Sequence, residues 1–285
     1  MIMETTQESP LKKYKRKPKV FIDLPSQGKY SSTGTLSNDV YTQLAVYSMT
    51  ASDEILFKTP DALINGEATA RCIQSCIPSI QNPWDIATLD LDTILVGIRM
   101  ATYGSNMSVQ SKCPHCKTTN AYDIGLSEIL DFYQRCEYSD TIQVDDFTIK
   151  LKPLTYRQLT ENQKKAVAMQ RAMDIQVRAL EDNEDEKAKY VDSLINQIAE
   201  HGISVIFDNI ESISVDGETE TRRSEIIDFM TGSDVHIFQK VKNHIDSQSK
   251  IWRTPTQTVV CGNEECGKEH NILISLDQSD FFARG

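Results

Sequence analysis

Two short stretches, Cys113-Pro-His-Cys116 and Cys261-Gly-Asn-Glu-Glu-Cys266, indicate how this chain is held together. Each lies in a turn between two strand-like runs, and 144 residues, from Lys117 to Val260, separate the two couples. Zn²⁺ favours tetrahedral coordination by thiolates, and a short spacing between two cysteines is typical of each half of such a site. The sequence therefore predicts one zinc site with four ligands, Cys113, Cys116, Cys261 and Cys266.

The residues around each couple favour β-hairpins. Met107–Lys112 lead into the first turn and Lys117–Asn120 leave it. Thr256–Val260, which are rich in β-branched residues, precede the second turn, and Asn271–Ser275 follow it. Each couple should lie at the tip of a hairpin, as in a zinc ribbon.

Other interpretations of the cysteines remain open. Cys-Pro-His-Cys is also the active-site tetrapeptide of oxidising thioredoxin-like proteins, in which a helix N-terminus stabilises the thiolate, and the thiols could also be buried without a metal. The run Thr118-Thr-Asn120 disfavours a helix directly after Cys116, and a redox couple does not require the second pair. His115 or His270 could replace one sulfur. Because four thiolates complete a closed shell, we expect both histidines to face solvent or to lie beside the ligands.

The composition is that of an ordinary soluble globular protein. The chain has 285 residues, 39% hydrophobic and 25% charged, so it can bury one large core or two modest ones. It contains no apolar run of about 18 residues, and its polar N-terminus does not resemble a signal peptide. Seven cysteines without an export signal indicate a reducing compartment, in which thiols stay available for a metal. Cys72, Cys76 and Cys136 remain after the zinc ligands; Cys72 and Cys76 lie four residues apart on an expected helix, so they share one face and should pack in a core rather than bind metal.

Charge is distributed unevenly along the chain. The formal net charge is -11, but residues 1–19 contain six Lys or Arg and two Glu, a net of +4, which leaves -15 for residues 20–285. This pattern predicts a flexible basic arm on an acidic body, and the arm either stays solvated or docks as a strap on an acidic neighbour or a nucleic acid. The acidic body argues against wrapping a phosphate backbone, because that binding depends on Lys and Arg.

Hydrophobic periodicity and turn residues predict an α+β fold, with a helix-rich body, short antiparallel strands and a zinc-ribbon-like site made by two distant cysteine-bearing hairpins. Helices are expected at about 66–77, 91–103, 127–133, 155–181 and 235–251, strands at 20–24 and 40–46, and hairpins at 141–151 and around 210–217. The charged run Glu181–Glu186 should form the tip of an αα-hairpin. The apolar stripes of its two helices either pack on each other or, if wider than one partner covers, offer a docking face.

These elements suggest four segments. We expect a flexible basic arm (1–19), an N-terminal α+β domain with the first zinc half (20–135), a helical domain that includes the αα-hairpin (136–254), and a second zinc half that returns to the first (255–285).

Motifs of catalysis are missing from the sequence. It has no glycine-rich phosphate loop, no His-Glu-x-x-His and no Gly-x-Ser-x-Gly. A zinc held by four cysteines has no open position for substrate water, so the metal should be structural and the protein should not be an enzyme.

Three segments, in order along the chain, resemble motifs of one protein family. Phe21-Ile-Asp-Leu-Pro-Ser-Gln-Gly-Lys-Tyr30 resembles "LPS-x-G-x-Y/F", Met49-Thr-Ala-Ser-Asp-Glu-Ile-Leu56 resembles "MT-x-x-EE-x-L", and Ile98-Arg-Met-Ala-Thr-Tyr-Gly-Ser105 resembles "R-x-A-S-Y-G". With the first cysteine couple next, they are similar to the T4-type baseplate hub subunit and hub-assembly proteins of contractile-tailed bacteriophages. The resemblance covers about residues 20–135 and continues through the second couple and Asp280-Phe-Phe282.

The resemblance implies a structural or assembly component of the phage tail baseplate, present in the virion and in the host cytoplasm during assembly. Its partners would be other tail and baseplate proteins, to which the basic arm could strap, with no small-molecule substrate, membrane or nucleic acid. Two alternatives stay open: a zinc-ribbon regulator that binds nucleic acid, favoured by the cations of residues 12–19, and a thiol-disulfide enzyme based on Cys113 and Cys116.

Overall fold

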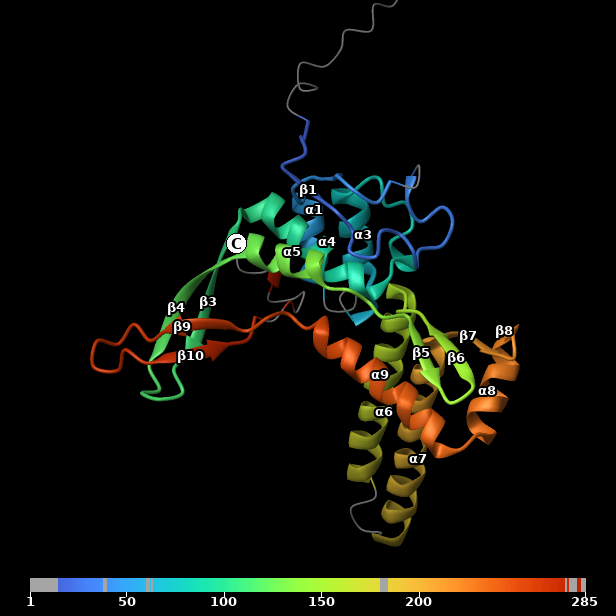
Figure 1. Ribbon diagram of the computed structural model, residues 1–285. Coiled ribbons are helices and arrows are strands. Elements are labelled where there is room, and N and C mark those ends of the chain that lie inside the picture. Colours follow the sequence, from blue (N-terminus) through green and yellow to red (C-terminus); the bar gives the residue numbers. More distant parts are fainter. Residues whose placement is uncertain are drawn as a thin grey trace, which may run out of the picture.

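The computed structural model describes residues 15–37, 40–59, 62, 64–179, 184–274, 276 and 281–282, with side chains described up to 176 in the first helix of the αα-hairpin and from 186 in the second. Figure 1 shows a central helical body, a pair of β-hairpins that extends to one side, and a small sheet with a projecting αα-hairpin on the other side. The predicted α+β class is confirmed.

The central body is built around one buried helix, α4 (Thr88–Tyr103), which starts three residues before the predicted position. Strands β1 (Val20–Ile22) and β2 (Leu44–Val46) pair antiparallel beside it, so the strand expected at 40–46 is shorter than predicted. The remaining helices of this body are α1 (Ala51–Phe57), α3 (Glu67–Cys76), the 3₁₀ turn η3 (Pro83–Asp85) and α5 (Leu126–Arg135). Gly97 of α4 allows β1 to approach closely, because a Cβ atom there would lie 2.9 Å from Ile22 Cγ2.

The two cysteine couples lie in hairpins, as predicted. β3 (Asn106–Lys112) pairs with β4 (Thr119–Gly125), and β9 (Gln257–Val260) pairs with β10 (Glu269–Ile272). In both hairpins the last paired residues flank the cysteine turn, Lys112 opposite Thr119 and Val260 opposite Glu269. The hairpins form separate two-stranded sheets and lie side by side (Figure 1).

A four-stranded antiparallel sheet organises the second half of the chain. Its strands are β5 (Thr141–Val144), β6 (Phe147–Leu151), β7 (Ile210–Val215) and β8 (Glu218–Glu220), in the order β5-β6-β7-β8. Both predicted hairpins are confirmed, but the pairing of β6 with β7 that joins them was not predicted. Helices α8 (Arg223–Gly232) and α9 (Val235–Ile251) follow the sheet.

The described residues form two hydrophobic cores. One joins β1, β2 and the helices of the central body with the end of the chain, including Ile272, Ile274, Phe281 and Phe282. The other lies between the four-stranded sheet and helices α8 and α9. Between α5 and α9 the chain touches the first core again only around Tyr156 and Leu159 among the described residues, and it rejoins this core after α9, which brings the second cysteine couple back towards the first.

The αα-hairpin consists of α6 (Tyr156–Ala179) and α7 (Glu184–Asp208) and projects from the body (Figure 1). Its predicted stripes are only partly covered: Met169 and Met173 are half-buried and Leu194 is buried, whereas Ile195 is 56% exposed and Ile198 46% exposed. The tip expected at Glu181–Glu186 is shorter than predicted, because α7 already begins at Glu184, and residues 181–183 lie outside the described residues, as do the side chains of Val177 and Leu180. Among the described helices, none is long and apolar enough to cross a membrane.

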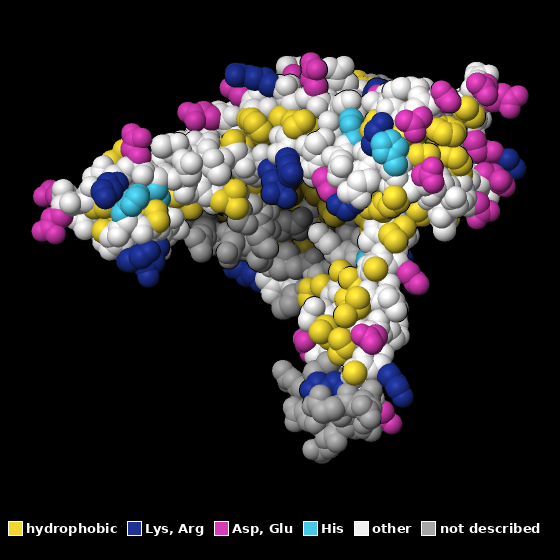
Figure 2. Space-filling view, turned by 60° about the horizontal axis from the view of Figure 1, so that its bottom comes forward, with side chains coloured by type: hydrophobic (Ala, Val, Ile, Leu, Met, Phe, Trp, Pro, Cys, Tyr) yellow, Lys and Arg dark blue, Asp and Glu magenta, His cyan; other side chains and the backbone are white. Residues whose placement is uncertain are grey.

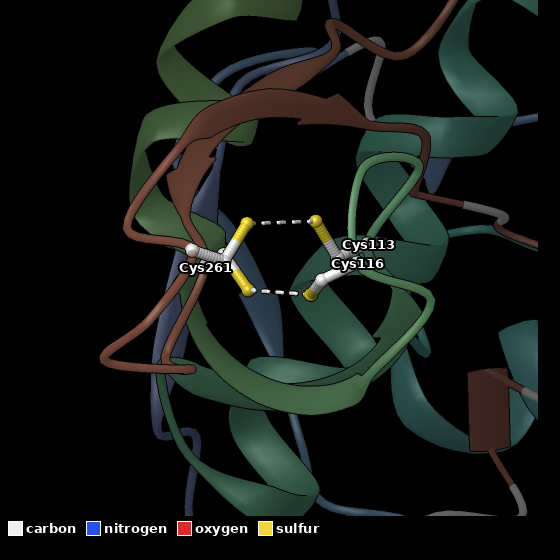
Figure 3. A group of neighbouring side chains, drawn as sticks. Cys113, Cys116 and Cys261 are labelled. Atoms are coloured by element: carbon white, nitrogen blue, oxygen red, sulfur yellow. Dashed lines mark hydrogen bonds between the residues drawn. The ribbon is translucent and has the colours of Figure 1, made fainter.

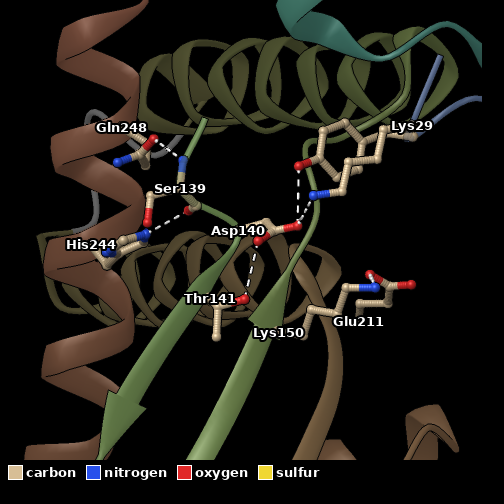
Figure 4. Close-up of polar contacts among 9 residues, drawn as sticks. Lys29, Ser139, Asp140, Thr141, Lys150, Glu211, His244 and Gln248 are labelled. Atoms are coloured by element: carbon tan, nitrogen blue, oxygen red, sulfur yellow. Dashed lines mark hydrogen bonds and ion pairs between the residues drawn. The ribbon is translucent and has the colours of Figure 1, made fainter. Parts of the chain in front are cut away.

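Polar contacts connect the central body to the sheet at the start of β5 (Figure 4). Lys29 Nζ lies 2.5 Å from Asp140 Oδ2, so a loop of the N-terminal half is ion-paired to the segment that enters β5. The amide of Ser139 donates to Gln248 Oε1 at 3.0 Å, and the Ser139 carbonyl lies 2.8 Å from His244 Nε2. Helix α9 is thereby fixed to the same segment.

Part of the basic arm lies against the body. Arg16 donates to the carbonyls of Ser48 at 2.7 Å and Ser75 at 3.1 Å, and the amide of Lys19 donates to the carbonyl of Val46 at 2.9 Å. Residues 1–14 lie outside the described part of the chain.

Candidate metal centre

Four sulfur atoms meet between the tips of the two hairpins. The Sγ atoms of Cys113, Cys116, Cys261 and Cys266 all lie within 4.8 Å of one another. Cys113 Sγ is 4.0 Å from Cys266 Sγ, and Cys116 Sγ is 3.5 Å from Cys261 Sγ (Figure 3). Each hairpin contributes two sulfurs, so the cluster exists only when the two turns face each other.

The spacing of the sulfurs fits a tetrahedral ion. A Zn–S bond of about 2.3 Å and tetrahedral angles require sulfurs about 3.8 Å apart. The two cross-hairpin distances, 3.5 and 4.0 Å, fall on either side of this value. The donor set is four soft thiolates with no carboxylate, which suits Zn²⁺ or iron better than Mg²⁺ or Ca²⁺. The four residues therefore fit a structural metal ion.

Similar hydrogen bonds shape the two turns. In the first, the amide of Cys113 donates to the Thr118 carbonyl at 2.9 Å, and Lys117 adopts a φ of 66°. In the second, the amide of Cys261 donates to the Lys268 carbonyl at 3.0 Å, and Gly267 adopts a φ of 52°. The positive φ directly after the second cysteine of each couple turns the backbone so that both sulfurs point to the same side.

Hydrogen bonds favour a thiolate at one position of the cluster. The hydroxyl and amide of Thr118 donate to the Cys116 sulfur and lower the pKa of this thiol to about 6. At Cys261 the amide of Asn263 acts to lower the pKa, but burial and the neighbouring sulfurs outweigh it and raise the pKa to about 11. Four crowded sulfurs thus resist full deprotonation unless a cation compensates their charge.

Two polar residues beside the cluster were not anticipated from the sequence. Asn120 Nδ2 lies 3.5 Å from Cys261 Sγ, and Asn263 Nδ2 lies 3.4 Å from Thr118 Oγ1, so both join the two hairpins. A Cβ at Gly262 would lie 3.1 Å from Asn120 Oδ1, so Gly262 leaves room for this contact. In the sequence, the signal that could have identified Asn120 and Asn263 is their position within a few residues of a cysteine couple.

The two histidines lie outside the cluster. His115 is exposed, as expected. His270 is buried rather than solvent-facing, and its ring packs edge-on against Tyr122 with centroids 5.8 Å apart. Neither ring nitrogen of His270 has a hydrogen-bond partner among the described residues.

The remaining cysteines lie away from the cluster. Cys72 and Cys76 are buried in the first core with their sulfurs 3.9 Å apart, as predicted from their helical spacing. Cys136 is half-buried near the end of α5, where its thiol lies 3.4 Å from the Phe132 carbonyl. Cys116 is followed by a turn and strand β4 rather than by a helix, so the backbone lacks the helix N-terminus that activates a thioredoxin-like cysteine.

The three sequence motifs provide anchors for the first core. Ser26 donates from its amide (2.8 Å) and hydroxyl (2.5 Å) to buried Asp90, and Thr50 forms a capping box with Asp53 at the start of α1. Arg99 donates to the carbonyl of Phe281 and lies over its ring. The motifs thus hold loops and the end of the chain to α4 and α1.

Fold and site define an α+β protein in which two distant parts of the chain meet at a closed four-cysteine centre. The chain belongs to the T4 bacteriophage base plate protein family, which matches residues 18–283. No curated protein and no solved structure matches the chain. Membership of this family gives the protein a structural or assembly role in the baseplate of a phage tail, among other tail proteins.

Proposed function

We propose that this chain is a hub subunit or a hub-assembly factor of the baseplate, and that it acts through protein–protein contacts on a fold stapled by zinc. One observation carries the proposal: in a member of a baseplate family, two cysteine couples separated by 144 residues bring their four sulfur atoms within 4.8 Å of one another. Such a centre contributes rigidity rather than reactivity, because four protein ligands leave no coordination position for a substrate.

The proposed ligands are Cys113, Cys116, Cys261 and Cys266, and the proposed ion is Zn²⁺. Bound zinc would supply a cross-link between the two hairpins and no catalytic chemistry. The chain's own residues support this role, since Asn120 and Thr118 donate hydrogen bonds to sulfur and the two turns present the thiols pairwise. Elemental analysis of the purified protein should find one zinc per chain, and another metal or none would contradict this assignment.

The nucleic-acid alternative gains no support from the arrangement of charges. Residues 20–285 carry a net charge of -15, and Arg16 of the arm is engaged with backbone carbonyls of the body. A strap that docks on an acidic protein neighbour agrees better with this distribution.

Mass spectrometry of purified tails tests the proposed role. A hub subunit should be present in finished tails at a fixed ratio to known baseplate proteins. An assembly factor should instead bind hub intermediates and be absent from finished tails. A chain found neither in tails nor bound to any tail protein in infected cells would refute both forms of the proposal.

A further inference from the structure

The four sulfurs of the candidate metal centre are also close enough to bond covalently across the two hairpins. Cys116 Sγ lies 3.5 Å from Cys261 Sγ, and Cys113 Sγ lies 4.0 Å from Cys266 Sγ. A disulfide has an S–S bond of about 2.05 Å, so the first pair would have to close by about 1.5 Å and the second by about 2 Å. In each pair the two sulfurs come from different hairpins, so either bond would join the hairpins covalently.

Contacts that need no metal hold the two turns opposite each other. Asn120 Nδ2 lies 3.5 Å from Cys261 Sγ, and Asn263 Nδ2 lies 3.4 Å from Thr118 Oγ1. Each of these contacts joins one hairpin to the other. They therefore favour the same pairing of sulfurs in the metal-free chain.

One thiol of each pair is accessible from solvent. Cys116 and Cys266 are half-buried, whereas Cys113 and Cys261 are buried. Figure 2 shows the pair of hairpins at the left of the molecule, with charged side chains at its end. A soluble oxidant can therefore reach Cys116, and the buried Cys261 is the neighbour that completes the reaction.

We propose that Cys116 and Cys261 form a disulfide across the two hairpins when the metal is lost in an oxidising medium. The inference rests on the proposed function, since it concerns the same cysteines and a component of the phage tail. Disulfides persist on the surface of virions, where the surroundings are oxidising. The bond would close the same loop of 144 residues that the metal would close, so the two distant parts of the chain stay joined.

The reaction balances with a small disulfide oxidant such as oxidised glutathione. The Cys116 thiolate attacks one sulfur of the oxidant, which forms a mixed disulfide and releases one glutathione thiolate. The Cys261 thiolate then attacks Cys116 Sγ, forms the bond across the hairpins and releases the second glutathione thiolate. The two cysteines thereby lose two electrons and two protons, and the oxidant is reduced to two thiols.

A bond within each couple is the alternative, as in thioredoxin-like enzymes. Two residues separate Cys113 from Cys116 and four separate Cys261 from Cys266, so such bonds would close very short loops and leave the hairpins unconnected. The bond across the hairpins instead keeps a loop of 144 residues closed in the unfolded chain. The two pairings therefore differ in the compactness of the denatured protein.

Oxidation of the full chain with oxidised glutathione tests the pairing. The protein is stripped of metal with a chelator, oxidised, and run on a denaturing gel without reductant. The oxidised wild type should migrate faster than the reduced chain, and trypsin should release residues 113–117 linked to residues 254–268. A second cut after Glu264 separates Cys261 from Cys266, and fragmentation in the mass spectrometer distinguishes Cys116 from Cys113.

Paired variants supply the controls. Cys113→Ser combined with Cys266→Ser leaves Cys116 and Cys261, and this chain should still give the fast-migrating species. Cys113→Ser combined with Cys116→Ser leaves Cys261 and Cys266, and oxidation should not change its migration. Cys136→Ser should behave like the wild type, because that thiol lies outside the cluster.

Thermal unfolding shows whether the bond replaces the metal. The oxidised metal-free chain should unfold about 10 °C above the reduced metal-free chain, and equal temperatures would overturn the inference. Bonds confined to each couple, or thiols that stay reduced, would also overturn it while leaving the proposed zinc centre in place. A cross-link between Cys116 and Cys261 in a protein that binds no zinc when reduced would support the inference and contradict the proposed zinc centre.

Discussion

Removal of the proposed metal should destabilise the protein mainly because the unfolded chain regains conformational entropy, and less because contacts are lost. The cross-link between Cys116 and Cys261 closes a loop of 144 intervening residues. For a loop of this length, the chain-entropy relation for a cross-link gives about 5 kcal/mol at 25 °C. Because a typical domain is stable by only about 5–15 kcal/mol, removing the constraint should lower the unfolding temperature by about 10 °C.

The perturbation we favour is Cys261→Ser, compared with the wild type in zinc and in chelator. Cys261 is 4% exposed and serine differs little from it in size, so the change removes a ligand without opening a large cavity. Cys136→Ser is the matched control, since that thiol lies outside the cluster. Calorimetry should show that the unfolding temperature falls by the same amount in the wild type with chelator and in Cys261→Ser. Adding chelator to the variant should not lower its unfolding temperature further.

Hydrogen exchange should show where the destabilisation begins. An isolated two-stranded hairpin is marginally stable in water, so β9 and β10 should lose amide protection first. Helix α4, buried in the first core, should keep its protection until global unfolding. Equal melting temperatures and equal exchange with and without metal would refute the reasoning, as would a loss of the same size in Cys136→Ser.

Three further changes test the packing of the first core. Burial raises the pKa of the Asp90 carboxyl from 3.8 to about 6, so the contribution of this group to stability is complete below about pH 4 and is lost as the pH rises through 6. In denaturant titrations, the unfolding free energy of the wild type relative to Asp90→Asn should therefore fall by about 3 kcal/mol across this pH range. A difference between the two proteins that stays constant with pH would contradict the assignment. Gly28 has a φ of 72°, and the Tyr41 ring occupies the space that a Cβ atom would need. Gly28→Ala should therefore lower the unfolding free energy by at least about 1 kcal/mol in the same titrations, and an unchanged denaturation midpoint would contradict this prediction. Phe282 is 4% exposed and stacks on Phe57 with ring centroids 4.7 Å apart. Phe282→Ala should therefore destabilise the protein by about 3–5 kcal/mol. A melting temperature equal to that of the wild type would show that Phe282 does not stabilise the first core.

Local elements were largely predictable because they depend on neighbouring residues. The final helix, expected at 235–251, is α9, and the Asp-Asp and Asp-Gly turns gave the hairpins β5–β6 and β7–β8. Helix α4 starts at Thr88 rather than at residue 91 because of a contact that is distant in the sequence. The amide of Thr88 donates a hydrogen bond to the carbonyl of Leu154 at 2.8 Å.

The environment of the candidate site was less accessible from the sequence. The four cysteines could be chosen because thiolate chemistry requires a fixed number of ligands whatever the fold. The contact of Asn120 with the cluster and the burial of His270 could not be predicted, because both depend on how the two hairpins face each other. The same holds for α6 and α7: the apolar stripes were visible, but which residues remained exposed was decided by the position of the neighbouring helix.

The sequence by itself determined most of the helices and the two cysteine hairpins, and it singled out the four cysteines of the candidate centre, since turn residues, hydrophobic periods and thiol pairs act over short distances. Only the tertiary structure decided that β6 pairs with β7 and that Phe281 and Phe282 return to Arg99 and Phe57. These features join residues as far apart as Phe57 and Phe282, which are 225 positions apart in the sequence. Contacts of that kind form only when the whole set of buried surfaces offsets the entropy of closing long loops, which no local pattern encodes.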